Sequence, residues 1–140
     1  MITFINNNLE EPFKLLKQKY EEANNLKQKN IEAISISSFS TENKEVDSRF
    51  VNLKLVDNDE FIFFSNYNSP KSKQFDSHKQ ISAIFFWPVL DTQIRIKAII
   101  SRTSHQYNQK YFFNRSIEKN ALAISSNQSR VVDSYSEIKN

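Results

Sequence analysis

Two cations five residues apart, Arg49 and Lys54, are the first residues whose type and spacing suggest a binding site. They flank apolar residues in the stretch 48–54, and this composition is typical of a β-strand. Side chains alternate along a strand, so Arg49 shares one face with Val51 and Lys54 shares the other with Phe50. Such a strand suits a phosphate-bearing ligand that lies along a sheet. A half-buried strand with solvated charges would give the same pattern.

A second polar set combines Ser65, Ser69 and Lys71, where a strand runs into a helix that begins with Pro70. The free N–H groups and the dipole at a helix N-terminus favour an anion. The set therefore suits a phosphate group. Ordinary capping of the helix by Ser69 is the alternative.

A third set, Gln93, Arg95 and Lys97, lies at alternate positions of another predicted strand. Alternate positions share one face of a sheet, so these side chains are expected on one wet or ligand-facing side. A plain solvated strand face is the alternative.

Several kinds of chemistry are excluded by residue usage. The chain has no cysteine, which excludes disulfides and thiolate catalysis. His78 and His105 lack partners at metal-ligand or triad spacing, so we predict no metal site and no serine-type triad. The absence of glycine excludes a P-loop and a GxGxxG fingerprint. If the protein catalyses a reaction, a bound organic cofactor is expected to carry it, and no catalytic side chain is assigned.

The overall composition fits one globular domain over residues 1–140. Hydrophobic residues make up 39% and charged residues 25% of the 140 residues. The net charge is only +3, and the basic residues are spread along the chain, which argues against a nucleic-acid partner. No apolar run approaches the roughly 20 residues of a membrane span, and no signal peptide is recognised. We therefore expect a cytoplasmic protein.

Hydrophobic patterning predicts a mainly β protein, a small antiparallel β-barrel or rolled sheet with peripheral helices. Residues 1–8 are expected to be a disordered lead-in, followed by an amphipathic helix over 11–27. Strands are predicted at 31–39, 46–56, 61–65, 81–87 and 93–101, and helices at 70–77, 104–114 and 116–125.

In this order, the motifs resemble those of the pyridoxamine 5′-phosphate oxidase family of FMN-binding split barrels. The residues that carry the resemblance are 48–54, 61–71, 85–88, 93–96, 110–112, Arg115 and 128–129. The resemblance runs from about residue 11 to about residue 132. It implies an antiparallel Greek-key-type split barrel, FMN as cofactor, and a homodimer with FMN at the subunit interface.

The resemblance also implies roles for individual residues. Those implied for the cofactor are Arg49, Phe50, Val51, Lys54, Phe64, Ser65, Ser69, Lys71, Gln93, Gln128 and Ser129, the last two from the other subunit. Those implied for the substrate are Lys54, Tyr111, Arg115 and Lys119. The substrate would be a small phosphorylated compound such as pyridoxamine or pyridoxine phosphate. In the family reaction, substrate hydride passes to FMN and dioxygen reoxidises the flavin.

The chain departs from the family pattern at several positions. Pro70 stands where the family usually has an arginine, and Lys119 stands where it has a serine. The chain ends at Asn140, before the segment that supplies a tryptophan and an Arg-x-His motif, so we expect a C-terminally shortened member. Two hypotheses follow. The protein is an FMN-dependent oxidoreductase, or it is a non-catalytic or divergent FMN-binding protein that kept the flavin site. A generic small-anion-binding or nucleic-acid-binding barrel is a third hypothesis.

Overall fold

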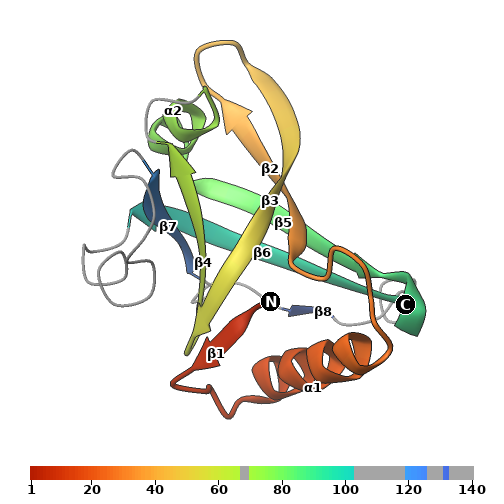
Figure 1. Ribbon diagram of the computed structural model, residues 1–140. Helices are drawn as coiled ribbons and strands as arrows, with labels where there is room; N and C mark the ends of the chain where they lie inside the picture. The colour runs from red at the N-terminus through yellow and green to blue at the C-terminus, as the bar shows by residue number, and fades with distance from the viewer. Residues whose placement is uncertain (67–69, 103–118, 126–130, 133–140) are drawn as a thin grey trace.

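The computed structural model describes residues 1–66, 70–102, 119–125 and 131–132, and these are mostly β-strand (Figure 1). The strands are β1 (Thr3–Ile5), β2 (Ala33–Ser40), β3 (Glu45–Asp57), β4 (Glu60–Asn66), β5 (Gln80–Trp87), β6 (Thr92–Arg102), β7 (Lys119–Ser125) and β8 (Val131–Val132). The helices are α1 (Glu11–Asn25), α2 (Pro70–Ser77) and the single 3₁₀ turn η1 (Pro88–Leu90).

The strands form a closed antiparallel barrel. They follow the order β1-β3-β2-β5-β6-β7-β4, and β4 also pairs with β3, which closes a ring of six strands. β1 extends the sheet parallel to the end of β3, and β8 pairs with β6. Consecutive strands β4 and β5 are not neighbours, and α2 lies in the connection between them at the end of β4 away from α1 (Figure 1). The predicted barrel with peripheral helices is confirmed.

Strand alternation sets the core. In β6, Ile94, Ile96, Ala98 and Ile100 are buried, while the residues between them are half-buried or exposed, as predicted. The largest fully buried side chains are aromatic, and Trp87 also donates from Nε1 to the Ile31 carbonyl over 3.0 Å. Aromatic rings bury a large apolar area, and a buried indole N–H needs an acceptor. This contact therefore joins the end of β5 to the segment before β2.

Helix α1 covers one end of the barrel. Leu16, Tyr20 and Ala23 are buried on its inner face, which confirms the predicted amphipathic stripe. The helix was predicted to reach residue 27, but it ends at Asn25, and Leu26 is 56% exposed. The Tyr20 hydroxyl accepts from the backbone N–H of Ile2 over 2.9 Å, so the helix also holds the N-terminal segment.

Two predicted elements are wrong. Residues 1–8 contain β1, in which Thr3 pairs with Leu55, in place of a disordered lead-in. Residues 119–125, predicted as helix, form strand β7 between β4 and β6. Strand β1 pairs with residues more than 40 positions away in sequence, and β7 pairs with residues more than 15 positions away. The local sequence pattern does not report such pairing. The helix predicted at 104–114 lies outside the described residues.

Candidate functional site

The first predicted cation, Arg49, reaches helix α2. It pairs with Ile36 across β3 and β2, on the face that points into the barrel. Its Nη1 donates to the Ile36 carbonyl over 3.2 Å and to Ser38 Oγ over 2.7 Å. Its Nη2 donates to Gln74 Oε1 on α2 over 2.9 Å. The structure thus places Arg49 against the helix whose start carries the second polar set.

The surroundings of Arg49 combine burial with a nearby carboxylate. Its guanidinium carbon lies 5.5 Å from the ring centre of Phe75, which is a cation–π arrangement. Burial lowers the pKa of Arg49, and the charge of Asp47 acts in the opposite direction. The ordinary value is so high that the guanidinium stays charged at neutral pH. Arg49 is therefore a fixed positive charge at the place where α2 contacts the barrel.

The second predicted cation, Lys54, lies at a β-bulge. Leu53 pairs with Phe63 and Leu55 with Ile62, so Lys54 is an extra residue on β3 relative to β4. The alternation predicted for 48–54 holds up to Leu53, which is in the main core. After the bulge, Leu55 packs with Ile62 in a separate small cluster. The bulge therefore interrupts the regular alternation of the strand at Lys54.

Lys54 is not close to Arg49. Five residues of strand separate the two Cα atoms by about 17 Å, at the usual rise per residue. The Lys54 Nζ lies 3.9 Å from Glu32 Oε1, and the Met1 amine bonds the other oxygen of the same carboxylate. The pKa of Glu32 is lowered, and the hydrogen bond from that amine is the largest cause. Burial acts in the opposite direction, and the charge of Lys54 lowers the pKa further. The two cations therefore lie at separate positions along β3 and have different partners.

The outer face of the sheet holds other predicted residues. Phe50 is 75% exposed and pairs with Ser35, which also pairs with Ile84 of β5. Two residues along β5, Phe86 is 59% exposed and pairs with Gln93 of β6. Directly paired residues share a face, so Phe50 and Gln93 lie on the outer face, opposite the inward-facing arginine. The structure does not bring Gln93 and that arginine onto one face.

The remaining predicted residues are placed less fully. Val51 packs at the edge of the main core, and Phe64 packs against the small cluster of Leu55 and Ile62. The backbone of Ser65 lies in β4, that of Lys71 in α2 and that of Lys119 in β7. Ser69, Tyr111, Arg115, Gln128 and Ser129 lie outside the described residues.

Sequence reasoning did not identify three polar residues around Arg49, namely Ser38, Asp47 and Gln74. Gln74 follows Lys71 by three residues, so helical spacing alone would have put it one turn further along the same helix. The position of Ser38 beside Arg49 depends on the register of the β2–β3 hairpin, in which Ser37 pairs with Ser48. No local signal specifies that register.

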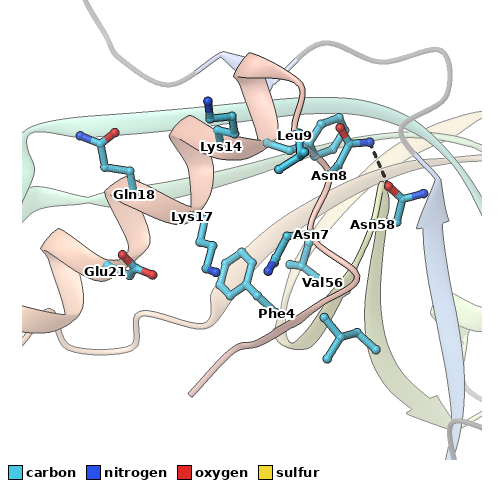
Figure 2. Close-up of a pocket in the computed structure, with 12 residues that line it drawn as sticks. Phe4, Asn7, Asn8, Leu9, Lys14, Lys17, Gln18, Glu21, Val56 and Asn58 are labelled. Atoms are coloured by element: carbon cyan, nitrogen blue, oxygen red, sulfur yellow. Dashed lines mark hydrogen bonds between the residues drawn. The ribbon is translucent and has the colours of Figure 1, made fainter.

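A pocket of about 330 Å³ lies at the other end of β3, between α1 and the segment that follows β1 (Figure 2). Phe4 and Phe13 supply apolar lining, and Lys14 and Lys17 supply charge. Asn58, in the β3–β4 turn, borders it. None of the residues predicted to bind cofactor or substrate lines this pocket, so it is separate from the arginine site.

Neither a metal-ligand cluster nor a membrane-spanning helix is found in the part of the chain that the structure describes. In that part, no three histidine or carboxylate side chains are grouped so that they could hold a metal ion. None of its helices has both the length and the apolar character that crossing a membrane requires.

Curated proteins with similar sequences are pyridoxine/pyridoxamine 5′-phosphate oxidases. No family profile matches the chain. The pyridoxine/pyridoxamine 5′-phosphate oxidase 1 of Hydrogenovibrio crunogenus is 35% identical over 124 residues, which is 89% of this chain and 57% of that protein. The corresponding oxidase of Azotobacter vinelandii is 35% identical over 130 residues, or 92% of this chain and 60% of that one. The chain is a relative of the pyridoxamine 5′-phosphate oxidase family. It spans little more than half the length of these relatives.

Solved structures agree with that family in fold. PhzG of Burkholderia lata, in complex with tetrahydrophenazine-1-carboxylic acid, matches with a TM-score of 0.69 at 23% identity, covering 76% of this chain and 52% of PhzG. A pyridoxamine 5′-phosphate oxidase-related, FMN-binding protein of Nostoc punctiforme matches with a TM-score of 0.68 at 12% identity, covering 84% and 81%. The chain has the split-barrel fold of these proteins, as predicted.

Proposed function

We propose that this chain is an FMN-binding oxidoreductase of the pyridoxamine 5′-phosphate oxidase type. The observation that carries the proposal is the contact of Arg49 with α2, through Gln74. It joins a cation on β3 to the middle of α2, and the same helix begins at Pro70, beside Lys71. A cation together with a helix start suits a phosphate group. The fold and the 35% identity to named oxidases support the same proposal.

The proposed substrate is a phosphorylated B6 vitamer, pyridoxamine or pyridoxine phosphate or a related compound. Lys54, Tyr111, Arg115 and Lys119 are proposed to hold it, on the strength of the family resemblance. When bound, FMN would supply the hydride acceptor for the substrate carbon that is oxidised. Dioxygen would then restore the oxidised flavin, with hydrogen peroxide as product. For an amine substrate, water would hydrolyse the resulting imine to the aldehyde and ammonia.

A homodimer in the cytoplasm is part of the proposal, with Gln128 and Ser129 reaching the FMN of the other subunit. The exposed phenylalanines on the outer face of the sheet support it. Phe50 and Phe86 are 75% and 59% exposed, and a second subunit would remove their apolar surface from water.

Flavin titration followed by turnover tests the proposal. The purified protein would be titrated with FMN while the quenching of flavin fluorescence is followed. The complex would then be mixed anaerobically with pyridoxamine phosphate, and the loss of flavin absorbance near the visible maximum measured. On admission of air, pyridoxal phosphate and peroxide would be quantified against each other, with equal amounts expected.

The outcomes separate the two hypotheses. Binding, bleaching and equal product yields would support the oxidase. Binding of FMN with no bleaching by pyridoxamine phosphate would instead support the divergent FMN-binding protein. A protein that does not bind FMN at micromolar concentration would contradict both.

A further inference from the structure

Gln74 lies where α2 meets two strands of the barrel. Its side-chain oxygen accepts from Ser38 Oγ over 2.8 Å and from Arg49 Nη2 over 2.9 Å. Its side-chain nitrogen donates to Asp47 Oδ2 over 2.9 Å. One amide thus bonds a residue of β2 and two residues of β3.

The chemistry of these partners requires one orientation of the amide. The guanidinium of Arg49 can only donate, and the carboxylate of Asp47 can only accept. A reversed amide would place its NH₂ group against the guanidinium and its oxygen against the carboxylate, and both contacts would be lost. Gln74 is therefore held by donors on one side and an acceptor on the other.

This arrangement keeps Arg49 both fixed and charged. A long arginine side chain loses rotamer freedom when it is held, and contacts with Ser38 and Gln74 hold it before any ligand arrives. Gln74 is neutral and stands between the guanidinium and Asp47, and its side-chain nitrogen donates a hydrogen bond to that carboxylate. A glutamate in its place would fix the guanidinium equally well but would cancel its charge.

We propose that Gln74 is a positioning residue, which holds Arg49 beside α2 so that the guanidinium meets the phosphate of the cofactor. This inference rests on the proposed function, because it needs FMN as the ligand. Gln74 itself makes no contact with the cofactor in this proposal. Its role is to orient a cation and to separate that cation from Asp47.

The test compares two flavins that differ only in the phosphate. Affinities for FMN and for riboflavin would be measured by fluorescence quenching for the unaltered protein, for Gln74→Met and for Gln74→Glu. Methionine has a similar length but lacks the amide. Gln18→Met is the matched control, since Gln18 is also on a helix, bonds a side chain on that helix, Glu22, and is exposed. Circular dichroism would confirm that every variant is folded.

We expect Gln74→Met to weaken FMN binding about tenfold, as loss of one hydrogen bond to a charged group does, and to leave riboflavin binding unchanged. Gln74→Glu should weaken FMN at least as much. Gln18→Met should change neither flavin. Equal losses for FMN and riboflavin would show a merely structural role and overturn the proposal, as would unchanged FMN affinity in Gln74→Met.

A measurement without ligand keeps the inference independent of flavin chemistry. The side-chain N–H signals of Arg49 would be followed by NMR in the unaltered protein and in Gln74→Met. A held guanidinium rotates slowly, so its signals should broaden or average in the variant. Identical signals would overturn the positioning role even where FMN binds. A protein that binds neither flavin would defeat the proposed function, and the phosphate part of this inference with it.

Discussion

Arg102 at the end of β6 donates to Asp76 near the end of α2, with 2.6 Å between Nη2 and Oδ2. A second contact, from Nε to the other carboxylate oxygen, spans 3.4 Å. The pair ties α2 to β6, while Gln74 ties the same helix to β2 and β3. Helix α2 is thereby attached to the barrel on both sides, next to the arginine that we propose for the cofactor phosphate.

The Asp76–Arg102 pair should make stability depend on pH. The hydrogen bond from Arg102 is the largest cause that lowers the pKa of Asp76, and burial, the next largest, acts against it. A carboxylate with a lowered pKa stabilises the folded state above its unfolded pKa, and this contribution is lost as pH falls through the folded value, below about 4. We expect Asp76→Asn to lower the urea midpoint at pH 7, with a difference from the unaltered protein that shrinks below pH 4.

A matched variant for that experiment is Asp91→Asn. Asp91 is exposed and has a backbone φ of 48°, which asparagine tolerates well. Its urea midpoint should equal that of the unaltered protein at both pH values. A deficit in Asp76→Asn that stays constant down to pH 3 would show that the ionised pair is not its cause.

Two lysines should contribute separately to FMN binding. We expect Lys54→Ala and Lys71→Ala each to weaken FMN by about 1–3 kcal/mol, because each removes a charge-assisted hydrogen bond. Lys19→Ala is the control, since Lys19 is an ion-paired lysine of α1, 3.8 Å from Glu22. Fluorescence titration with FMN gives the three affinities. Unchanged affinity in both site variants would mean that the cofactor site is wrongly assigned.

Replacing Trp87 should destabilise the barrel. Trp87→Phe leaves the Ile31 carbonyl without its donor and leaves space in the core, where Trp87 is 1% exposed. We expect a loss of about 1–3 kcal/mol in the free energy of unfolding, measured by circular dichroism in urea. Leu26→Ala, at a position that is 56% exposed, should cost less than about 0.5 kcal/mol. Equal losses in the two variants would show that burial of Trp87 is not the source of its effect.

The end of α1 offers a stabilising change. Lys27 has a φ of 58°, donates its N–H to the Asn24 carbonyl and is followed by a bond from Gln28 to the Ala23 carbonyl, which together form a Schellman motif. Glycine adopts this conformation without the steric cost that a side chain brings. We expect Lys27→Gly to raise the free energy of unfolding by roughly 1 kcal/mol, seen as a higher thermal midpoint.

The control for that change is Lys29→Gly, two residues on, which is exposed and does not have a positive φ. Glycine there only adds freedom to the unfolded chain, so its midpoint should stay equal or fall. A lower midpoint for Lys27→Gly would contradict the steric argument.

Local signals in the sequence predicted the elements that are stabilised locally. Helix α2 begins and ends where Pro70 and the polar residues after it predict, because capping and the proline φ act within one turn. Strand β7 was mistaken for a helix, because its strand state comes from pairing Ala121 with Phe64 and Ile124 with Ile100. Strand β1 was missed for the same reason.

The sequence by itself determined the class of the fold, the two cations Arg49 and Lys54, and the family resemblance, since alternation and motif order are properties of the chain. The tertiary structure alone decided that Gln74 meets Arg49 and that a bulge lies at Lys54. It also decided that Gln93 faces away from that arginine. Hairpin register, barrel closure and the placement of α2 depend on contacts between residues far apart in sequence, and those contacts exist only once the barrel has closed.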